Sequence, residues 1–304
     1  MMLENVLPFN VQTSLSFLDY KGLYELRIRA NKVCTVNYYN NYYFLGINGI
    51  TDKKENAIIL SQDDIAGIIQ KASNYSLYAV NDELKNGFLC LPGGIRIGLV
   101  GQTVSENNSI ITIKNISSLN IRFPHEVKGI AEKVIDFLLN GIDFLNTLII
   151  SPAGVGKTTL LRDLIRLLSS VRYAKNVLVV DERNEISSST NSVCGLDLGD
   201  FSDVIVSCPK EQAIVSGIRS MSPDIIATDE LGTKKDVEAV EFASTCGTNI
   251  LATIHAKNLE ELKWKKDFEP LINNKIFKRY IFLSNRKGKG TIERIYNENF
   301  ETIL

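Results

Sequence analysis

Short apolar runs and amphipathic stretches alternate through the second half of the chain. The apolar runs are nearly continuous, which is typical of strands buried on both faces of a parallel sheet. They predict strands over residues 147–151, 176–181, 224–229 and 249–254. Apolar residues at helical spacing predict helices over residues 157–169, 210–221 and 235–246. This order predicts an α/β fold with a mainly parallel sheet and helices on both faces.

In the first half, apolar and polar residues alternate over short segments instead. The alternation predicts strands over residues 24–36, with a turn at Ala30-Asn31, and over residues 91–100 and 111–123. An aromatic-rich segment broken by Asn40-Asn41 predicts a hairpin over residues 38–45. Helical spacing predicts a helix over residues 61–73 with Ser61 as its N-cap, and a short helix with its end over residues 78–87.

This change of pattern predicts a domain boundary. We expect an N-terminal α/β domain over residues 1–124 and a second domain over residues 125–304. The second domain is predicted to open with an amphipathic helix over residues 128–139 and to close with a hairpin over residues 279–296. The hairpin turn, residues 286–290, is basic. A solvated turn is its default interpretation, and contact with nucleic acid or lipid headgroups is the alternative.

Composition narrows the function classes. The chain of 304 residues has 44% hydrophobic and 23% charged residues and a net charge of −1, so no overall basic field favours nucleic acid or anionic lipid. The cysteines are scattered without a C-x2-C pair, which favours reduced thiols over disulfides or zinc. We see no signal peptide and no apolar run of the roughly 18 residues that a membrane span needs. We therefore expect a cytoplasmic protein that docks at a membrane only through partners.

The segment between the first strand and first helix of the second domain reads Ser-Pro-Ala-Gly-Val-Gly-Lys-Thr. A strand, a Gly-rich loop, Lys-Thr and a helix in this order predict a phosphate-binding loop. Lys157 would reach the β- and γ-phosphates, and the Thr158 hydroxyl would ligate Mg²⁺. Ser151 replaces the first glycine of the pattern, and a chance Gly-rich turn is the alternative. We predict ATP and Mg²⁺ as cofactors, with the nucleotide held by Ser151, Pro152, Ala153, Gly154, Val155, Gly156, Lys157, Thr158 and Thr159.

Polar chemistry follows each of the other predicted parallel strands. Asp229 would orient a water or hydroxyl in the coordination shell of Mg²⁺, and Glu230 would polarise the attacking water. An ordinary loop start is the alternative for Asp229-Glu230. Asp181-Glu182 ends another apolar strand in the same way, and that strand could be mistaken for the Walker B strand. His255 is interpreted as a sensor of the γ-phosphate or as a structural histidine. Because ligands bind at the carboxyl ends of such strands, we expect one site, with metal ligands Thr158, Asp229 and Asp181.

The strand-end motifs together resemble those of the secretion-type ATPases of type II and type IV secretion and pilus systems. Residues 181–185, Asp-Glu-Arg-Asn-Glu, look like the aspartate box of that family, Glu-Asp-Pro-x-Glu. Residues 219–224 resemble the segment that leads into its Walker B strand, and residues 252–255 its histidine box. Asp229 departs from the glycine usual in pilus motors. The resemblance implies a RecA-like P-loop ATPase domain with the catalytic residues Glu230, Glu182, His255 and Arg219.

Over nearly its full length, the chain resembles the stage III sporulation protein AA family of endospore-forming bacteria. The motifs that carry this resemblance are Glu-Leu-Arg-Ile-Arg at 25–29, Gly-Ile-Arg-Ile-Gly at 94–98, Ser-Leu-Asn-Ile-Arg at 118–122 and the Ser-Pro phosphate loop. The resemblance implies a homo-hexameric ATPase that powers or assembles a secretion-like channel of membrane-embedded sporulation proteins. It would work on the mother-cell side of the membrane.

Arginines of the first domain have two interpretations. From the residues alone, Arg96 and Arg122 are surface arginines at a sheet edge. In the rings of the ATPases that this chain resembles, a neighbouring domain completes each nucleotide site with an arginine. The chain's own Arg162 and Arg166, on the helix after the phosphate-binding loop, are expected to face away from the phosphates. Arg172 lies just after that helix. We therefore predict that Arg122 or Arg96 acts in trans on the γ-phosphate.

Two other function classes are alternatives to this ATPase. A nucleic-acid-dependent P-loop ATPase is the main alternative. Some relatives of this motor carry a nucleic-acid module marked by an Arg-x3-His pair, and here Ile121 and Leu251 stand four residues before the two histidines. We therefore expect no stable nucleic-acid partner. A GTP switch ranks last, because both Asn-Lys sequences, at Asn31 and Asn274, lack the Asp of the guanine-reading motif.

Overall fold

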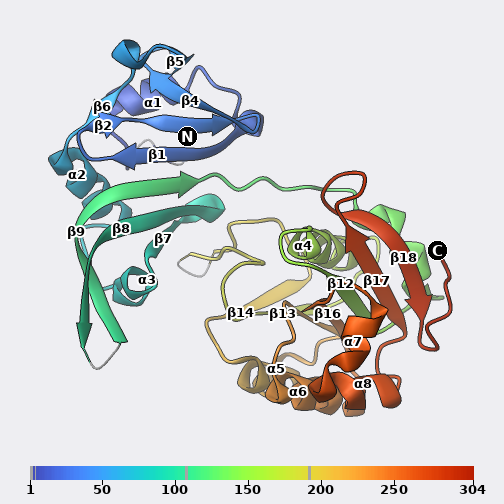
Figure 1. Cartoon of the computed structure of the whole chain (residues 1–304). Helices are drawn as coiled ribbons and strands as arrows, with labels where there is room; N and C mark the ends of the chain where they lie inside the picture. Colours follow the sequence, from blue (N-terminus) through green and yellow to red (C-terminus); the bar gives the residue numbers. More distant parts are fainter. Residues whose placement is uncertain (1–2, 4, 107–108, 191–192) are drawn as a thin grey trace. The chain divides into compact units, whose positions relative to one another are not determined.

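The structure is a computed structural model that describes residues 3, 5–106, 109–190 and 193–304 (Figure 1). It divides into two compact units, one formed by residues 1–125 with 188–195 and the other by residues 126–187 with 196–304. The expectation of no signal peptide rests partly on residues 1, 2 and 4, which lie outside the described residues. Among the described residues, no helix is both long and apolar enough to cross a bilayer.

The first unit is built on a seven-stranded antiparallel sheet in the order β5-β4-β3-β1-β9-β8-β7. Its strands are β1 (Leu23–Arg29), β3 (Thr35–Tyr38), β4 (Asn41–Gly46), β5 (Gly49–Thr51), β7 (Phe88–Leu91), β8 (Ile95–Glu106) and β9 (Ser109–Arg122). Strands β2 (Lys32–Val33) and β6 (Ile59–Leu60) form a small second sheet. The helices are α1 (Phe9–Leu15), α2 (Gln62–Ala72) and α3 (Asn81–Lys85).

Alternation along these strands separates a buried face from a polar face. Leu26, Ile97 and Ile121 belong to one core with the apolar residues of the helices. Arg96 and Arg122 lie on the other face, directly opposite each other on β8 and β9. The predicted strands, the hairpin and the α2 helix of this half are confirmed.

Local sequence explains two of these elements. In the β3–β4 turn, Tyr39 and Asn40 adopt the left-handed conformation, with φ of 48° and 63°. Helix α2 begins with a capping box. The Ser61 Oγ accepts a hydrogen bond from the Asp64 N–H at 3.1 Å, and the Asp64 carboxylate accepts one from the Ser61 N–H at 2.8 Å. A cap of this kind stabilises a helix by about 1 kcal/mol.

The second unit is built on a seven-stranded sheet in the order β14-β13-β15-β16-β12-β17-β18. All strand pairs are parallel except β17–β18, which confirms the mainly parallel sheet and the C-terminal hairpin. The strands are β12 (Thr147–Ser151), β13 (Val177–Asp181), β14 (Ser202–Val206), β15 (Ile225–Thr228), β16 (Asn249–His255), β17 (Arg279–Ser284) and β18 (Thr291–Asn297). The helices are α4 (Lys157–Leu168), α5 (Lys210–Met221), α6 (Lys234–Thr245), α7 (Leu259–Trp264) and α8 (Glu269–Asn273).

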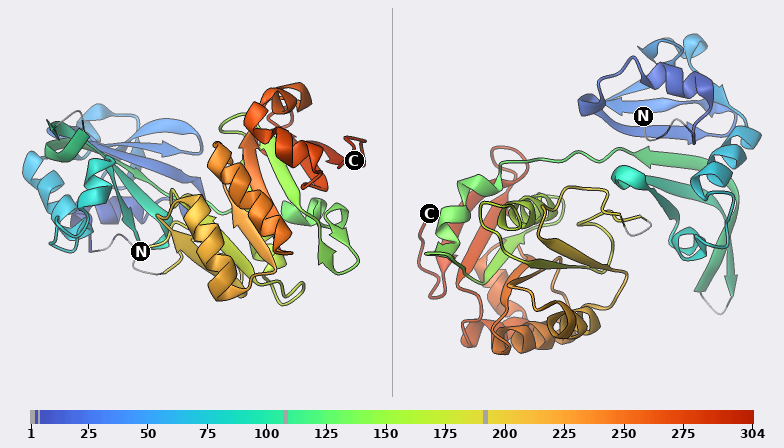
Figure 2. Two further views of the ribbon diagram at one scale, coloured as in Figure 1. Left: turned by 90° about the horizontal axis from the view of Figure 1, so that it is seen from below. Right: turned by 180° about the vertical axis from the view of Figure 1, so that it is seen from behind.

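Helices cover both faces of this sheet, as the apolar pattern predicted (Figures 1 and 2). Successive residues of β12 point to opposite faces. Ile149 packs in the core that contains the leucines of α4, and Ile150 packs in the core that contains α5 and α6. Each fully buried Leu or Ile contributes about 1.5–3 kcal/mol relative to an exposed position, so the two cores together fix the sheet between its helices.

One prediction for this half was wrong, and one strand was not predicted. Residues 128–139 do not form an amphipathic helix but two separate 3₁₀ turns, Ala131–Lys133 and Ile135–Phe137. The Asp163 carboxylate of α4 accepts a hydrogen bond from the Ala131 N–H at 2.8 Å, and β10 (Leu139–Asn140) begins a short pairing with β11 (Asp143–Phe144). The same apolar residues are therefore buried without a continuous helix. Strand β14 is absent from the predicted strands, because this half-exposed edge strand lacks a continuous apolar run.

Candidate functional site

A cavity of about 580 Å³ lies at the carboxyl edge of the second unit's sheet. All of its walls belong to the second unit. They come from the segment before the first 3₁₀ turn, from the loop between β12 and α4 with the start of α4, from the ends of β13, β15 and β16, and from the turn of the β17–β18 hairpin. The lining residues are Val127, Ile130, Ala153, Gly154, Gly156, Lys157, Thr158, Thr159, Arg183, Glu185, Asp229, Glu230, Thr253, His255, Lys289 and Gly290.

The loop after β12 reverses direction at two glycines before α4 begins. Gly154 and Gly156 have φ of 72° and 116°, values at which residues with a Cβ are strained. Helix α4 then starts at Lys157, and Lys157, Thr158 and Thr159 of its first turn line the cavity. The first backbone N–H groups of a helix have no acceptor within the helix, so this end favours negative charge. Among the nine residues predicted to hold the nucleotide, Ser151, Pro152 and Val155 do not line the cavity. Val155 is instead buried in the core.

Lys157 is buried, and its ammonium is held by neighbouring acceptors. The Nζ donates to the carbonyl oxygens of Ser151 at 2.9 Å and Pro152 at 3.0 Å, and it lies 2.8 Å from the Nδ1 of His255. Burial lowers the pKa of Lys157 to about 8, and the charge of Glu230 opposes this shift. The Lys157 ammonium is therefore a poorly solvated positive charge at the start of α4.

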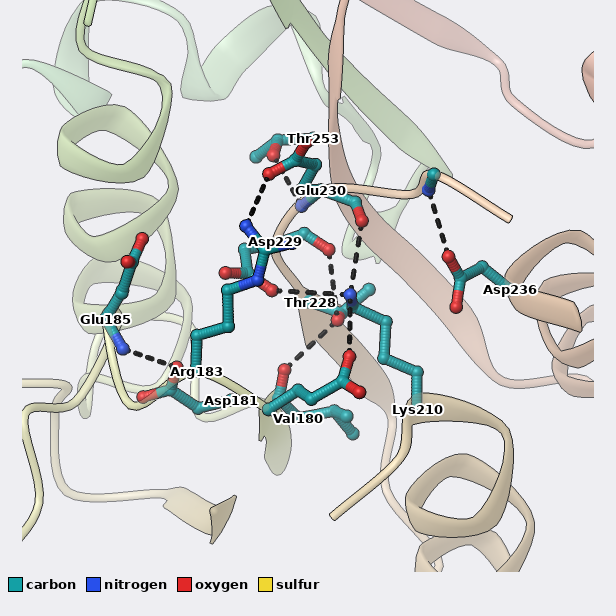
Figure 3. A network of polar contacts seen from close by, with 12 residues as sticks. Val180, Asp181, Arg183, Glu185, Lys210, Thr228, Asp229, Glu230, Asp236 and Thr253 are labelled. Carbon is teal, nitrogen blue, oxygen red and sulfur yellow. Dashed lines mark hydrogen bonds and ion pairs between the residues drawn. The ribbon is translucent and has the colours of Figure 1, made fainter. Parts of the chain in front are cut away.

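Asp229 and Glu230 follow β15 directly, as the sequence indicated. The Glu230 N–H donates to the Oγ1 of Thr253 on β16 at 2.9 Å, which fixes the start of this segment (Figure 3). The Oδ1 of Asp229 is buried without a hydrogen-bond partner. Burial raises the pKa of Asp229 to about 6, and Lys210 opposes this shift. The site therefore contains a carboxylate that lacks a strong partner.

Lys210, at the first position of α5, was not predicted as part of the site. Its side chain is 4% exposed and enters the space between two strand ends (Figure 3). The Nζ lies 3.2 Å from the Glu182 carboxylate, 3.1 Å from the Glu230 carbonyl oxygen and 3.7 Å from the Asp229 carboxylate. Lys210 therefore links the end of β13 to the end of β15.

Glu230 also has charged partners. The Arg183 guanidinium lies 3.0 Å from its Oε2 (Figure 3). The Nε2 of His255 lies 3.6 Å from its Oε1. Since His255 contacts Lys157 through its other ring nitrogen, Arg183, Glu230, His255 and Lys157 form a continuous polar chain along the cavity. The sequence placed Arg183 in a motif but gave it no role.

Asp181 and Glu182 lie beside this chain and do not line the cavity. The fully buried Asp181 carboxylate accepts hydrogen bonds from the N–H groups of Glu185 at 2.8 Å, Ile186 at 3.1 Å and Ser187 at 2.8 Å. These bonds stabilise the loop that follows β13. In this structure Asp181 supports a loop, and its role as a metal ligand stays a prediction.

Three further predicted residues are absent from the lining of the cavity. Arg219 is exposed in the last turn of α5, at the opposite end of that helix from Lys210. Arg96 and Arg122 belong to the first unit, where Arg96 lies over the Phe88 ring at 3.6 Å and Arg122 lies 3.6 Å from the Glu25 carboxylate. Their action on a phosphate stays a prediction.

The basic turn of the C-terminal hairpin is more than a solvated turn. The Gly290 N–H donates to the Val155 carbonyl oxygen at 2.6 Å, so the turn is bonded to the loop that precedes α4. Lys289 and Gly290 line the cavity. No local pattern indicates this contact, because the two segments are separated by more than a hundred residues.

The fold of this chain is similar to that of solved ATPases of secretion and pilus systems. It resembles the solved pilus retraction motor PilT with bound ADP, with a TM-score of 0.59, 13% identity and coverage of 90% of this chain and 76% of that one. It also resembles the ATPase DotB of Legionella pneumophila, with a TM-score of 0.54, 14% identity and coverage of 89% and 73%. The chain thus has the mixed α/β fold of secretion ATPases.

Sequence comparison identifies the family. Residues 4–303 match the family model described as sporulation stage III, protein AA. The stage III sporulation protein AA of Bacillus subtilis (strain 168) is 33% identical, over 98% of this chain and 95% of that protein. The chain belongs to the stage III sporulation protein AA family.

Proposed function

We propose that the second unit binds ATP with Mg²⁺ and hydrolyses it to ADP and phosphate. The observation that carries the proposal is the meeting of Lys157, Thr158, Asp229, Glu230 and His255 in one cavity at the carboxyl edge of a parallel sheet. In open α/β sheets this edge is where ligands bind. The cavity of about 580 Å³ has the size typical of small-molecule sites.

The residues of the cavity fit a magnesium nucleotide. The buried, unpartnered Oδ1 of Asp229 is an oxygen that a nearby cation would satisfy. Among the described residues, no group of three or more His, Cys, Asp or Glu side chains is arranged to hold a metal ion. Mg²⁺ suits such a site, because it is usually bound through one or two protein oxygens together with substrate phosphates and water. We infer that Thr158 and Asp229 provide the protein side of its coordination shell.

Roles follow from position and chemistry. Lys157 and the N–H groups at the start of α4 would neutralise and orient the phosphates. The Glu230 carboxylate would accept a hydrogen bond from the attacking water and take its proton. His255 lies between Glu230 and Lys157, and so would report the presence of the γ-phosphate to both. Asp181 and Glu182 would hold the neighbouring loop and Lys210 in place.

We further propose that the chain acts as a homo-hexameric ring, docked on membrane-embedded proteins, that powers or assembles a secretion-like channel during endospore formation. Membership of the sporulation family and the fold of secretion ATPases support this proposal. In such a ring, Arg122 or Arg96 of one subunit would reach the γ-phosphate bound to the next and stabilise its charge during transfer.

Nucleotide titration and a phosphate-release assay test the reaction. Lys157→Ala should lose tight ATP binding, whereas Glu230→Gln should bind ATP and hydrolyse it at least about 100-fold more slowly. Lys175→Ala, outside the cavity lining, is the matched control and should behave as the wild type. Absence of ATP binding by the wild type, or equal loss of binding in both site variants, would contradict the proposal.

A further inference from the structure

Arg183 is a cavity residue that the proposed roles leave without a function. It occupies the third position of residues 181–185, where the resembling aspartate box of secretion ATPases has proline. Its guanidinium lies 3.0 Å from the Glu230 carboxylate, which is the proposed acceptor of the water proton. Both the arginine in place of proline and its contact with Glu230 therefore lie where the proposed hydrolysis would take place.

The backbone that carries Arg183 is held firmly. The buried Asp181 carboxylate accepts hydrogen bonds from the N–H groups of Glu185 and Ser187. Asn184 has a left-handed φ of 54°, as a tight turn requires. On its other side, the same loop is bonded to α4, because the Arg162 guanidinium donates to the carbonyl oxygens of Glu185 at 2.9 Å and Ile186 at 2.8 Å. The loop thus presents Arg183 from a preorganised turn.

The side chain of Arg183 is held much more weakly than its backbone. The Arg183 and Glu230 side chains are 59% and 35% exposed, and ion pairs with this much exposure contribute little to stability. A guanidinium has five N–H donors in a planar fork that matches phosphate oxygens. A terminal phosphate carries more negative charge than a carboxylate, so it would compete effectively for the same group.

We propose that Arg183 is a catalytic arginine provided by the same chain that binds the nucleotide. Before ATP binds, Arg183 pairs with Glu230. When ATP binds, the guanidinium leaves Glu230 and donates to oxygens of the γ-phosphate. The exchange does two things at once, since it frees the Glu230 carboxylate for the attacking water and places a positive charge where negative charge spreads during transfer. The inference rests on the proposed ATPase function and adds a residue to it.

The test separates γ-phosphate recognition from general damage. We compare Arg183→Gln and Arg183→Lys with the wild type, in the full chain, for kcat and for the affinities of ADP and of an ATP analogue with an imido β–γ bridge. The matched control is Arg172→Gln, which changes an exposed arginine outside the cavity lining. We expect Arg183→Gln to lower kcat by about 100-fold or more and to weaken the analogue at least about tenfold, with the ADP affinity unchanged.

The Arg183→Lys variant separates the effect of the positive charge from the effect of the planar guanidinium. Arg183→Lys retains a positive charge without the fork, so it should recover part of kcat and of the preference for the analogue over ADP. An Arg183→Gln protein that hydrolyses ATP at the wild-type rate, or that loses ADP and analogue affinity equally, would overturn the inference. If Arg183→Gln does not fold, an Arg183→Lys protein with wild-type kcat and analogue preference would overturn it. A wild type that neither binds nor hydrolyses ATP would instead overturn the proposed function itself.

Discussion

Replacing Asp229 by asparagine should make the nucleotide-free protein more stable. Asp229 is 5% exposed, its Oδ1 has no hydrogen-bond partner, and Lys210 lies 3.7 Å from it. The carboxylate is therefore charged at neutral pH in a place that solvates charge poorly. Asparagine has the same shape without the charge, and Lys210 keeps its contacts with Glu182 and the Glu230 carbonyl oxygen.

The size of the effect follows from the pKa of Asp229, which rises from 3.8 to about 6 on folding. At about 1.4 kcal/mol per pH unit, this difference costs the folded state up to about 3 kcal/mol when the group is ionised in both states. As the pH falls from about 6 to about 4, the folded state takes up the proton before the unfolded state does, so the cost disappears. The increase in the free energy of unfolding caused by Asp229→Asn should therefore be complete at pH 7.5, about half as large at pH 5 and absent below pH 4.

Thermal unfolding in EDTA without nucleotide measures this gain. For a unit of this size, about 3 kcal/mol corresponds to a rise in Tm of up to about 6–12 °C. The control is Asp143→Asn, an exposed carboxylate in β11, which should change stability by less than about 0.5 kcal/mol. Equal Tm values for the wild type and Asp229→Asn at pH 7.5, or a difference that does not shrink on acidification, would refute the reasoning.

Three further predictions concern the loop before α4 and the ring. Because the pKa of Lys157 is about 8, ATP affinity measured by titration should fall as the pH rises from 7 to 9, and an unchanged affinity would argue against a phosphate contact. Gly156→Ala adds a Cβ 3.3 Å from Gly290 at a φ of 116°, so it should destabilise the second unit by about 1–3 kcal/mol in thermal unfolding and abolish ATP binding, whereas wild-type binding would contradict this. If Arg122 acts in trans, a co-assembled mixture of Arg122→Ala and Lys157→Ala chains should recover activity that neither has alone. Failure to recover it in rings verified by light scattering would leave Arg96 as the candidate.

The parallel sheet and most of its helices could be predicted because their signals are local. The strand over β12 is a continuous apolar run, and the helical spacing of α4 leaves little choice of structure. The rule that ligands lie at the carboxyl ends of such strands then predicts that Asp229, Glu230 and His255 lie close together. The cavity contains all three.

What the sequence did not reveal depends on contacts between distant segments. A lysine at the first position of a helix is usually exposed, and nothing near Lys210 in the chain indicates that it is buried between two strand ends. Two separate 3₁₀ turns over residues 131–137 stand where a helix was predicted, and the first of them is bonded to a distant segment, because the Asp163 carboxylate of α4 accepts a hydrogen bond from the Ala131 N–H. Arg219 was placed by resemblance alone, and the structure puts it at the far end of α5 from the cavity.

The bond between Gly290 and Val155 has a consequence for how this chain can change. Surface turns commonly gain and lose residues during evolution, and they are favoured places for inserting epitopes or fluorescent labels. In residues 285–290 even one added residue would shift the Gly290 N–H off the Val155 carbonyl oxygen. The turn should therefore keep a fixed length, and an insertion there should disturb a loop that lies more than a hundred residues earlier in the sequence.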